Sequence, residues 1–326
     1  MTPAPPTSRP PRTPAATALP RDSARAPARS PARAPAIQRR ALRLAIPNKG
    51  RLSDDCVDLL RRAGIPLQGS SERRLFAGAL DGRMQILFVR ARDIPAYVAA
   101  GTVDAGMTGL DVVKESQVKV RDLLDLRFGA CRLVLAVPHE QAAKGPKDIA
   151  DGSRIATTYP NLTKAYFAKA RRRVRIVGVS GACEVAPMLG VADAITDLAS
   201  SGSTLAMNHL REVSTLLHST CHLIAPAKTD AAAKDELDRL RFALGSVLAA
   251  RGKRYLLADV PRKALPEIQA FLPGVAGPTV VDIAGHKDLV AIQVVVDESE
   301  VYDAVSRLKA LGGRGILVMP IDRMVA

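Results

Sequence analysis

We predict an α/β protein that contains two strand-helix units in series, followed by a smaller βαββαβ module. Two observations lead to this fold class. Between about residues 41 and 226, short apolar runs alternate with amphipathic runs, as strands alternate with helices in α/β proteins. After Pro226 the order of the runs changes to strand, helix, two strands, helix and strand. That order is typical of a ferredoxin-like module.

The first 40 residues differ in composition from the rest of the chain. They hold ten of the 23 prolines, eight arginines and one acid, Asp22, and so contribute +7 of the formal net charge of +15. With almost no large apolar side chains, residues 1–40 cannot offset their ordering entropy, and we expect them to be disordered. A transit peptide and a basic arm for nucleic acid are the alternatives, but the prolines disfavour an amphipathic helix and no aromatic residue is present to stack on bases. We expect an inert extension or a misassigned start codon.

The overall composition is that of a packed globular chain, with 47% apolar and 24% charged residues among 326. No apolar run reaches the roughly 18 residues of a membrane span, and no apolar core of a signal peptide follows the basic start. We therefore expect a cytoplasmic protein that does not bind membranes. The four cysteines are far apart and lack the CxxC spacing of zinc sites, which predicts reduced, buried thiols.

The first unit starts with "ALRLAIPNKG", a strand that ends in the loop Pro-Asn-Lys-Gly. The run "DDCVDLLRRAG" then has apolar residues at helical spacing and stops at Gly64. The pattern is repeated by a strand at 84–89, a turn at 90–93, a helix around Ala96 and a short strand at 104–107.

The run "ACRLVLAVP" predicts a strand, and its nearly continuous apolar character is expected in a sheet that is covered on both faces. The run "SRIATTYPNLTKAYFAKA" then reads as a strand, a turn and a helix, and begins the second unit. We expect mostly parallel sheets in both units, with ligands beyond the carboxyl ends of the strands.

The stretch "DAITDLASSGSTLAMN" closes the second unit with a hydroxyl-rich loop at residues 200–204. We expect a strand at 194–198 before this loop and, after it, a helix at 204–210 that Ser203 or Thr204 caps. Free N–H groups and the dipole at a helix start attract an anion, so a phosphate would fit here. Asp193 and Asp197 would repel that phosphate and contact sugar hydroxyls or a cation instead. An Asx-type turn with an ordinary helix cap is the alternative.

A basic cluster follows the strand ends of the first unit. Each member alone is most simply a solvated surface charge. Together with a phosphate site they indicate a polyanionic substrate, because arginine can clamp phosphate oxygens. The members are Lys49, Arg51, Arg73, Arg74 and Arg90.

The part after Pro226 begins with a helix at 231–250, which we interpret as a connection across residues 227–252. The βαββαβ module then occupies residues 253–326. Such modules bind small ligands or pair edge to edge, and the pattern by itself names no ligand. Its second helix places on one face Val301, Ala304, Val305, Leu308 and Leu311.

Six motifs in the same order make the chain resemble the ATP phosphoribosyltransferases, the first enzymes of histidine biosynthesis. The likeness spans about residues 42–324. It implies the long form of the enzyme, in which a catalytic part of two α/β lobes, similar to periplasmic binding proteins, occupies 41–226 and a ferredoxin-like regulatory domain follows. The motifs are "PNKGRLSDD", "VRARDIPAYVAAGTVDAGMTG", "FGACRLVLAVP", "RIATTYPNLTKAYF", "GVADAITDLASSGSTLAMNHLREV" and "ILVMPIDRM".

The resemblance also implies roles for residues. The hydroxyl-rich loop would bind the 5′-phosphate of phosphoribosyl pyrophosphate, with Asp193 and Asp197 near the ribose hydroxyls. The basic cluster would face ATP and the pyrophosphate, with Arg51, Arg73, Arg74 and Arg90 as catalytic residues. The implied substrate-binding residues are Lys49, Glu184, Asp193, Asp197, Ser200, Ser201, Gly202, Ser203 and Thr204.

Two motifs depart from the family pattern. The chain has Gly181-Ala182-Cys183-Glu184 where the family usually has Gly-Ser-Val-Glu, and Ala199-Ser200-Ser201-Gly202 where the family often has Val-Ser-Thr-Gly. The glutamate and the glycine are retained, but position 182 offers no hydroxyl.

In the reaction that the resemblance implies, N1 of adenine attacks C1′ of the ribose as pyrophosphate leaves. The main task is to stabilise negative charge on the leaving group, through the basic cluster and through Mg²⁺ that bridges pyrophosphate oxygens. We expect Mg²⁺ mainly on the substrate and name no protein ligand for it. We identify no general base among the five histidines, of which only His209 lies in a substrate motif.

The resemblance further implies feedback inhibition by histidine, through the C-terminal module, and a homo-oligomer with hexameric and dimeric forms. In the implied pocket Asp259 would pair with the α-ammonium group, and Thr279 would donate or accept a hydrogen bond. Val275 and Val295 would enclose the ring, next to Gly315. The alternative for Asp259 is a strand-end residue that caps the following "PRKAL".

Two other classes of function compete with this one. A solute-binding protein of the periplasmic type would have similar lobes, but the chain shows no export signal and has the hydroxyl-rich loop. A nucleic-acid binder would fit the isoelectric point near 10.1, but an aromatic content of 3% leaves little capacity for base stacking. We therefore expect no nucleic-acid partner.

Overall fold

The computed structural model describes residues 41–67, 76–78, 82–200, 202–274 and 277–325. Predictions for residues 1–40, Arg73, Arg74, Ser201 and Val275 lie outside these ranges. The described elements all belong to one compact unit, Arg39–Ala326. Within the described ranges, no helix combines the length and the apolar character that crossing a membrane requires.

The first lobe is built on a six-stranded sheet with the order β2-β3-β1-β4-β11-β5. β1 pairs in parallel with β3 and with β4, so the carboxyl ends of these three strands meet at one edge. Leu44 and Ile46 of β1 share a buried core with Cys56 and Leu60 of α1. The elements are β1 (Leu42–Pro47), α1 (Arg51–Arg62), β2 (Phe76–Gly78), β3 (Met84–Val89), η1 (Ala91–Asp93), α2 (Ile94–Ala99), β4 (Ala105–Gly109), α3 (Leu110–Ser116), β5 (Val120–Asp125) and β11 (Cys221–Pro226).

The second lobe has a five-stranded sheet with the order β10-β6-β9-β7-β8. β7 pairs in parallel with β8 and β9, so the loops after these strands share one edge. Val134 and Leu135 of β6 belong to two different buried clusters, which confirms that this strand is covered on both faces. The elements are β6 (Cys131–Pro138), η2 (Pro146–Asp148), β7 (Arg154–Thr157), α4 (Pro160–Lys169), β8 (Arg175–Gly178), η3 (Cys183–Val185), β9 (Ala194–Ala199), α5 (Ser203–Met207) and β10 (Leu210–Ser219).

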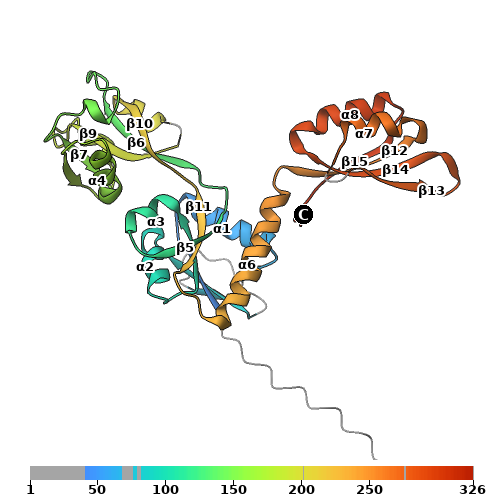
Figure 1. Cartoon of the computed structure of the whole chain (residues 1–326), viewed down its shortest axis with the longest axis horizontal. Helices are drawn as coiled ribbons and strands as arrows, with labels where there is room; N and C mark the ends of the chain where they lie inside the picture. The colour runs from blue at the N-terminus through green and yellow to red at the C-terminus, as the bar shows by residue number, and fades with distance from the viewer. Residues whose placement is uncertain (1–40, 68–75, 79–81, 201, 275–276, 326) are drawn as a thin grey trace, which may run out of the picture. The chain divides into compact units, whose positions relative to one another are not determined.

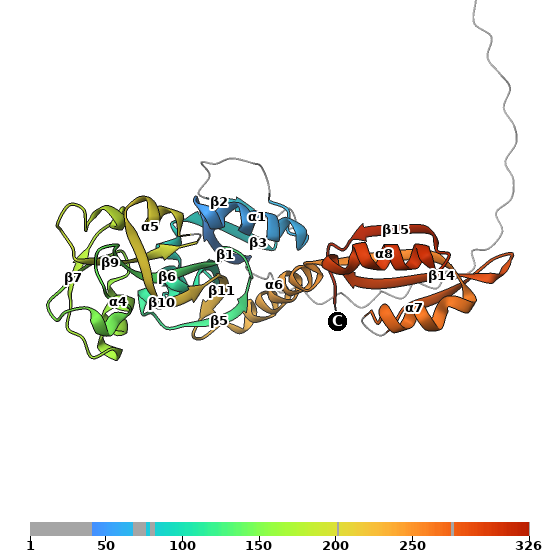
Figure 2. The same ribbon diagram turned by 90° about the horizontal axis from the view of Figure 1, so that it is seen from above.

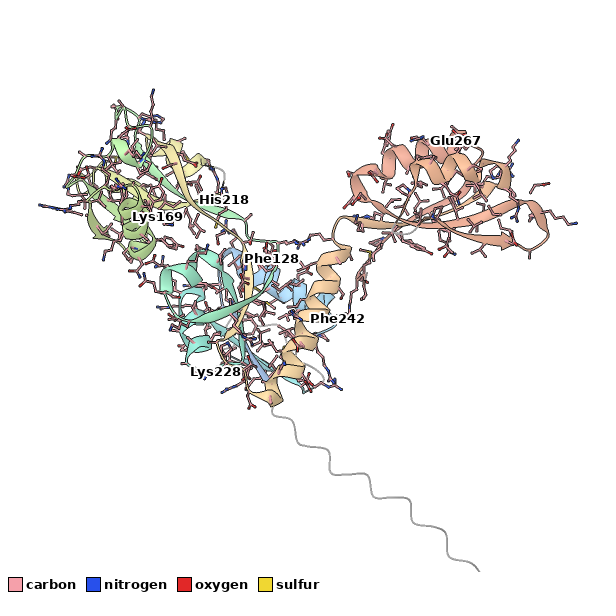
Figure 3. The ribbon with its side chains drawn as sticks, viewed as in Figure 1. Phe128, Lys169, His218, Lys228, Phe242 and Glu267 are labelled. Atoms are coloured by element: carbon pink, nitrogen blue, oxygen red, sulfur yellow. The ribbon has the colours of Figure 1, made fainter. Side chains whose placement is uncertain are left out.

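The α/β fold class is confirmed, but the expectation of mostly parallel sheets is wrong. Antiparallel pairs join β2 to β3, β11 to β4 and β5, and β6 to β9 and β10. All of these pairs except β2 with β3 involve strands that flank the passages between the lobes, because β5 and β6 lead outward and β10 and β11 lead back (Figure 1). Figure 3 labels Phe128 in the outward passage and His218 near the end of β10, before the return.

Helix α6 (Ala231–Ala250) is more than a connection, because one of its faces completes the core of the first lobe. Full burial of a leucine stabilises a fold by about 1.5–3 kcal/mol, so this face is a substantial part of the lobe's stability. Phe242 is 63% exposed and is labelled on this helix in Figure 3. The buried residues, at helical spacing, are Leu237, Leu240, Leu244, Val247 and Leu248.

The C-terminal domain has the predicted order βαββαβ, and its antiparallel strands lie in the order β13-β14-β12-β15. This topology confirms the ferredoxin-like module. Two helices cover one face of the sheet (Figures 1 and 2), and all five apolar residues predicted for the face of α8 and its end contribute to that core. The elements are β12 (Lys253–Pro261), η4 (Arg262–Ala264), α7 (Leu265–Phe271), β13 (Thr279–Ile283), β14 (His286–Asp297), η5 (Glu298–Glu300), α8 (Val301–Ala310) and β15 (Arg314–Pro320).

The prediction of reduced, buried thiols is confirmed. Cys56, Cys131, Cys183 and Cys221 are all buried and free of disulfides. Burial, together with the neighbouring Cys56, raises the pKa of the Cys221 thiol well above its usual range, so this thiol stays protonated.

Candidate active site

The described members of the basic cluster gather at the carboxyl edge of the first sheet. Pro47 and Val89 are partners at the ends of β1 and β3, and the N–H group of Asn48 donates to the Val89 carbonyl over 2.8 Å. The loops that follow therefore begin side by side. One loop carries Lys49 and Arg51 and the other carries Arg90, and all three side chains are exposed.

Arg51 has a specific position within this edge. It is the first residue of α1, and its Nη1 donates to the carbonyl of Ala130 over 3.4 Å. Ala130 lies just before β6, in the outward passage between the lobes. Arg51 therefore stands where the first lobe meets the chain that leads into the second.

The carboxyl edge of the second sheet gathers three segments: Thr158 and Tyr159 after β7, η3 after β8, and the hydroxyl-rich loop after β9. Gly202 in this loop has φ = 79°, a left-handed conformation that side chains rarely adopt. A Cβ at Gly202 would have no heavy atom within 4 Å, so its side-chain direction is open space. Ser200, Ser203 and Thr204 are exposed beside it.

The helix after the loop is shorter than the predicted 204–210. α5 ends at Met207, and Leu210 already belongs to β10. His209 lies between them with φ = 54°, a left-handed conformation that ends the helix. The run "LREVSTLLHS" is then a ten-residue strand that the sequence analysis did not assign.

Asp197 in β9 and Glu184 in η3 both belong to this edge. The Asp197 carboxylate accepts the N–H group of Leu198 over 2.8 Å and the thiol proton of Cys183. Burial raises the pKa of Asp197, and the charge of Glu184 adds to this rise. Burial and Asp197 raise the pKa of Cys183 to about 12, so the thiol keeps the proton that it donates.

Asp193 lies at the opposite end of β9 and is not part of this edge. Its carboxylate accepts the backbone N–H of Arg154 over 2.8 Å and forms an ion pair with the Arg154 guanidinium over 2.7 Å. The hydrogen bond to that side chain lowers the pKa of Asp193. The structure thus separates two aspartates that the sequence analysis grouped, and we exclude Asp193 from the proposed substrate site.

Arg92 is a residue of this region that the sequence analysis missed. It belongs to the first lobe, yet its Nη1 donates to the Thr158 carbonyl over 3.1 Å and its guanidinium lies 5.2 Å from the centre of the Tyr159 ring. The motif "VRARDIP" contains two arginines, and only Arg90 was selected from it.

A pocket of about 620 Å³ lies at the passages between the lobes, lined by Ser200 of the hydroxyl-rich loop together with Arg132 and His218. His222 also lines this pocket, but its Nδ1 is held 2.9 Å from the carboxylate of Asp122.

Three described residues implied for histidine binding, Asp259, Thr279 and Val295, share one face of the C-terminal sheet. Along β12 the buried residues alternate with half-exposed ones, and Asp259 belongs to the half-exposed set that faces away from the helices. Thr279 is the partner of Gln293, and Val295 is the partner of Tyr255, both in the corresponding half-exposed sets. Paired residues of antiparallel strands point to the same face of a sheet.

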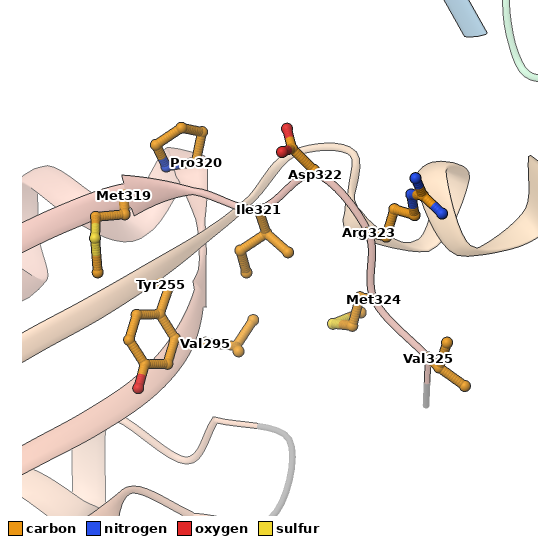
Figure 4. Close-up of a pocket in the computed structure, with 9 residues that line it drawn as sticks. All are labelled: Tyr255, Val295, Met319, Pro320, Ile321, Asp322, Arg323, Met324 and Val325. Carbon is orange, nitrogen blue, oxygen red and sulfur yellow. The ribbon is translucent and has the colours of Figure 1, made fainter. Parts of the chain in front are cut away.

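Two of the residues implied for histidine binding are direct neighbours. A Cβ built at Gly315 would lie 3.5 Å from Oδ2 of Asp259. Asp259 is inside β12 and pairs with Ala291 on one side and Arg314 on the other, so it is not the strand-end cap that was the alternative. Figure 4 shows Val295 and Tyr255 in the wall of a pocket of about 710 Å³ on the same domain.

Comparison with known proteins decides the family. Residues 90–246 match the family described as ATP phosphoribosyltransferase, and residues 250–323 match its C-terminal domain. The ATP phosphoribosyltransferase of Gemmatimonas aurantiaca is 48% identical over 291 residues, which are 87% of this chain and 99% of that relative. The chain belongs to the ATP phosphoribosyltransferase family.

Other relatives of the same family extend the match. The ATP phosphoribosyltransferase of Natronomonas pharaonis is 46% identical over 285 residues, which are 87% of this chain and all of that relative. A solved structure described as an ATP phosphoribosyl transferase (HisG:HisZ) complex from Thermotoga maritima aligns with a TM-score of 0.54 and 27% identity, over 63% of this chain and 98% of that one. The chain is accordingly a pentosyltransferase of the first step of histidine biosynthesis, and ATP and phosphoribosyl pyrophosphate are the substrates that fit the ATP phosphoribosyltransferase family.

Proposed function

We propose that the transfer takes place between the two carboxyl edges, with phosphoribosyl pyrophosphate on the second lobe and ATP facing the first. The observation that carries this proposal is that Asp197 and Glu184 belong to the same carboxyl edge as Gly202, whose side-chain direction is open space. A phosphate needs room and donors, and ribose hydroxyls need acceptors. The hydroxyl-rich loop supplies room and donors for the phosphate, and the two carboxylates supply acceptors for the ribose hydroxyls.

The basic cluster completes the arrangement electrostatically. As N1 of adenine bonds to C1′, the bond to pyrophosphate breaks and negative charge grows on the departing oxygens. Lys49, Arg51 and Arg90 lie at one edge of the first sheet, where fixed positive charges stabilise that growing charge. Asp197 would hold the ribose, and the chain's own contribution is then orientation and charge stabilisation, with no base required.

We propose Mg²⁺ as the metal of the reaction, bound mainly through substrate pyrophosphate. Among the described residues, no group of three or more His, Cys, Asp or Glu side chains could hold a metal ion alone. This fits Mg²⁺, which keeps several waters and takes one or two carboxylates together with substrate phosphates. Asp197 and Glu184 are the carboxylates of this edge, and the ion supplies charge neutralisation on the leaving pyrophosphate when it is bound.

The direct test is a coupled assay for phosphoribosyl-ATP together with pyrophosphate release, on the full chain with both substrates and Mg²⁺. We expect product only when both substrates are present. Binding of phosphoribosyl pyrophosphate alone, measured by calorimetry, tests the second lobe separately. Absence of phosphoribosyl-ATP under these conditions would overturn the assignment.

We also propose that the enzyme is a homo-oligomer and that it acts in the cytoplasm. A further proposal is that histidine inhibits the enzyme by binding to the face of the C-terminal sheet that the helices leave open. The shared face of Asp259, Thr279 and Val295, with Gly315 beside Asp259, supports a single pocket. The Asp259 carboxylate suits an α-ammonium group. Because a ligand shifts an equilibrium only through differential affinity, histidine must bind an inactive arrangement more tightly than the active one.

A further inference from the structure

Helix α4 of the second lobe lacks a cap of its own. Its first flanking residue is Tyr159, which makes no side-chain capping hydrogen bond, and Pro160 occupies the first helical position. The N–H groups of Asn161 and Leu162 are therefore orphan donors, as in the first turn of any uncapped helix. Their acceptor has to come from elsewhere in the fold.

The first lobe supplies that acceptor. The two carboxylate oxygens of Glu115, in α3, accept the N–H groups of Asn161 and Leu162, each over 2.9 Å. The Asn161 side-chain amide also donates to the Glu115 carbonyl over 2.9 Å. One carboxylate of the first lobe thus caps a helix of the second, where its charge also suits the positive end of the helix.

Asp111, at the other end of α3, makes a second connection. It is buried, and its carboxylate accepts the hydroxyl of Tyr159 over 2.7 Å and the hydroxyl of Ser219 over 2.6 Å. Ser219 is the last residue of β10, next to the return passage. Burial and the charge of Asp111 raise the pKa of Tyr159, so the phenol remains a donor across the neutral pH range.

These contacts lie at the carboxyl edges that carry the proposed substrate site. Asp111 follows β4 closely and Tyr159 follows β7, while Arg92 adds its hydrogen bond from the end of η1 to Thr158. We call the contacts of Arg92, Asp111 and Glu115 with residues 158–162 the interlobe network. Among the described residues, none of the network's hydrogen-bond partners belongs to the hydroxyl-rich loop or to the basic cluster.

We propose that Asp111, Glu115 and Tyr159 are positioning residues, which fix the spacing between the lobes at which one bound substrate meets the other. This inference rests on the transferase reaction with its substrates divided between the lobes. A misplacement of about 1 Å can lower a reaction rate by about 100-fold, because the reacting atoms must be held nearly in contact. Loss of the network should therefore slow the chemical step while each lobe still binds its own substrate.

The test compares Tyr159→Phe with Tyr166→Phe in the full chain. Each substitution removes one phenol hydroxyl, but Tyr166 donates to Ser214 over 2.6 Å inside the second lobe and makes no interlobe contact that the structure records. We expect Tyr159→Phe to lower kcat by about 10- to 100-fold, with each KM and the Kd for phosphoribosyl pyrophosphate within about threefold of wild type. Tyr166→Phe should have wild-type kcat.

Glu115→Ala provides a second route, because Glu115 is only partly buried and the variant should fold even if Tyr159→Phe does not. We expect the same loss of kcat with retained substrate binding, and faster hydrogen exchange at the amides of Asn161 and Leu162. Wild-type kcat in Glu115→Ala overturns the inference, and so does an equal loss in Tyr166→Phe. Lost affinity for phosphoribosyl pyrophosphate would make these residues substrate ligands and also overturn it. A wild-type chain without activity contradicts the transferase assignment instead.

Discussion

Asp193 and Asp197 lie at opposite ends of the six-residue strand β9 and have opposite electrostatic environments. Asp193 precedes the strand and is paired with Arg154, which lowers its pKa. Asp197 stands near the carboxyl end, where burial and then Glu184 raise its pKa. The second environment is the one that suits the proposed functional carboxylate, because functional sites often combine burial with a neighbouring like charge that perturbs the pKa.

We predict that Asp197→Asn lowers kcat/KM for phosphoribosyl pyrophosphate by about 10- to 100-fold, the equivalent of one lost hydrogen bond to a charged group. Steady-state kinetics measures this. Asp193→Asn is the matched control and should retain kcat/KM within about twofold, since its contacts, a partly exposed ion pair and a backbone hydrogen bond with Arg154, lie at the other end of β9. Equal losses of kcat/KM in the two variants would show that substitution anywhere along β9 lowers activity, and would remove the evidence for a specific role of Asp197.

The same pair predicts opposite dependences of stability on pH. The raised pKa of Asp197 means that its ionisation opposes folding, so Asp197→Asn should gain stability relative to wild type as pH rises through the ordinary range of an aspartate and above. The lowered pKa of Asp193 means that its contribution is present above that range and is lost as pH falls through the folded-state value. Thermal unfolding between about pH 3 and 7 tests both signs.

Gly202→Val should weaken binding of phosphoribosyl pyrophosphate, because its side chain would extend into the open space beside the hydroxyl-rich loop. At the left-handed φ of Gly202 a valine is strained by about 1 kcal/mol. The control substitution must therefore introduce a valine at a similar φ. Gly152→Val does so: Gly152 has φ = 86°, has open space around its Cβ, and precedes β7 at the other edge of the sheet. Calorimetry should show at least about a tenfold weaker Kd for Gly202→Val alone.

Arg51→Ala and Arg90→Ala should each lower turnover while leaving thermal stability nearly unchanged. Both side chains are exposed, Arg51 at the start of α1 and Arg90 just after β3, where a surface charge contributes little to folding. We expect kcat/KM to fall by about 10-fold or more in each, through lost stabilisation of the leaving pyrophosphate. Lys169→Ala, at the exposed end of α4, is the control for a lost surface charge. Wild-type kinetics in both variants would mean that Arg51 and Arg90 are solvated surface charges without a role in turnover.

Asp259→Ala should leave activity without histidine unchanged and make it insensitive to added histidine. The carboxylate is the proposed partner of the ligand's ammonium group, and it lies in a domain with its own core. Inhibition curves measure this, with Asp303→Ala on α8 as the control on the covered side of the sheet. Loss of basal activity, or full inhibition of the variant, would mean that the histidine site lies elsewhere.

Periodicity predicted most elements because their burial is local in origin. The strand Met84–Val89 and the helix Ala231–Ala250 have the predicted bounds, since each has a continuous apolar face and a clear end. The strand β10 was not predicted because "LREVSTLLHS" is half-buried. Its sequence shows neither a regular alternation of apolar and polar residues nor a continuous apolar run. Its structure is set by pairing with β6, which lies far away in the sequence.

For the candidate site, residue type predicted which groups matter, but not which end of an element they occupy. Asp193 and Asp197 look equivalent in sequence, and only the direction of β9 separates them. Arg92 and Glu115 were not singled out because their partners, Thr158 and Asn161, belong to the other lobe. Contacts of that kind depend on how the chain returns between lobes, which a single sequence pattern does not encode.

The leucine face of α6 determines where the chain can be truncated, or joined to another regulatory domain, without damage to the first lobe. A catalytic fragment that ended at Pro226 would leave the first lobe without Leu237, Leu240 and Leu244 and would expose the surface that they cover. The helix ends at Ala250, and only residues 251 and 252 separate it from the start of β12 at Lys253. A chimaera that exchanges regulatory domains between family members should therefore be joined at residues 251–252. The catalytic part then keeps the α6 helix that packs against its own first lobe.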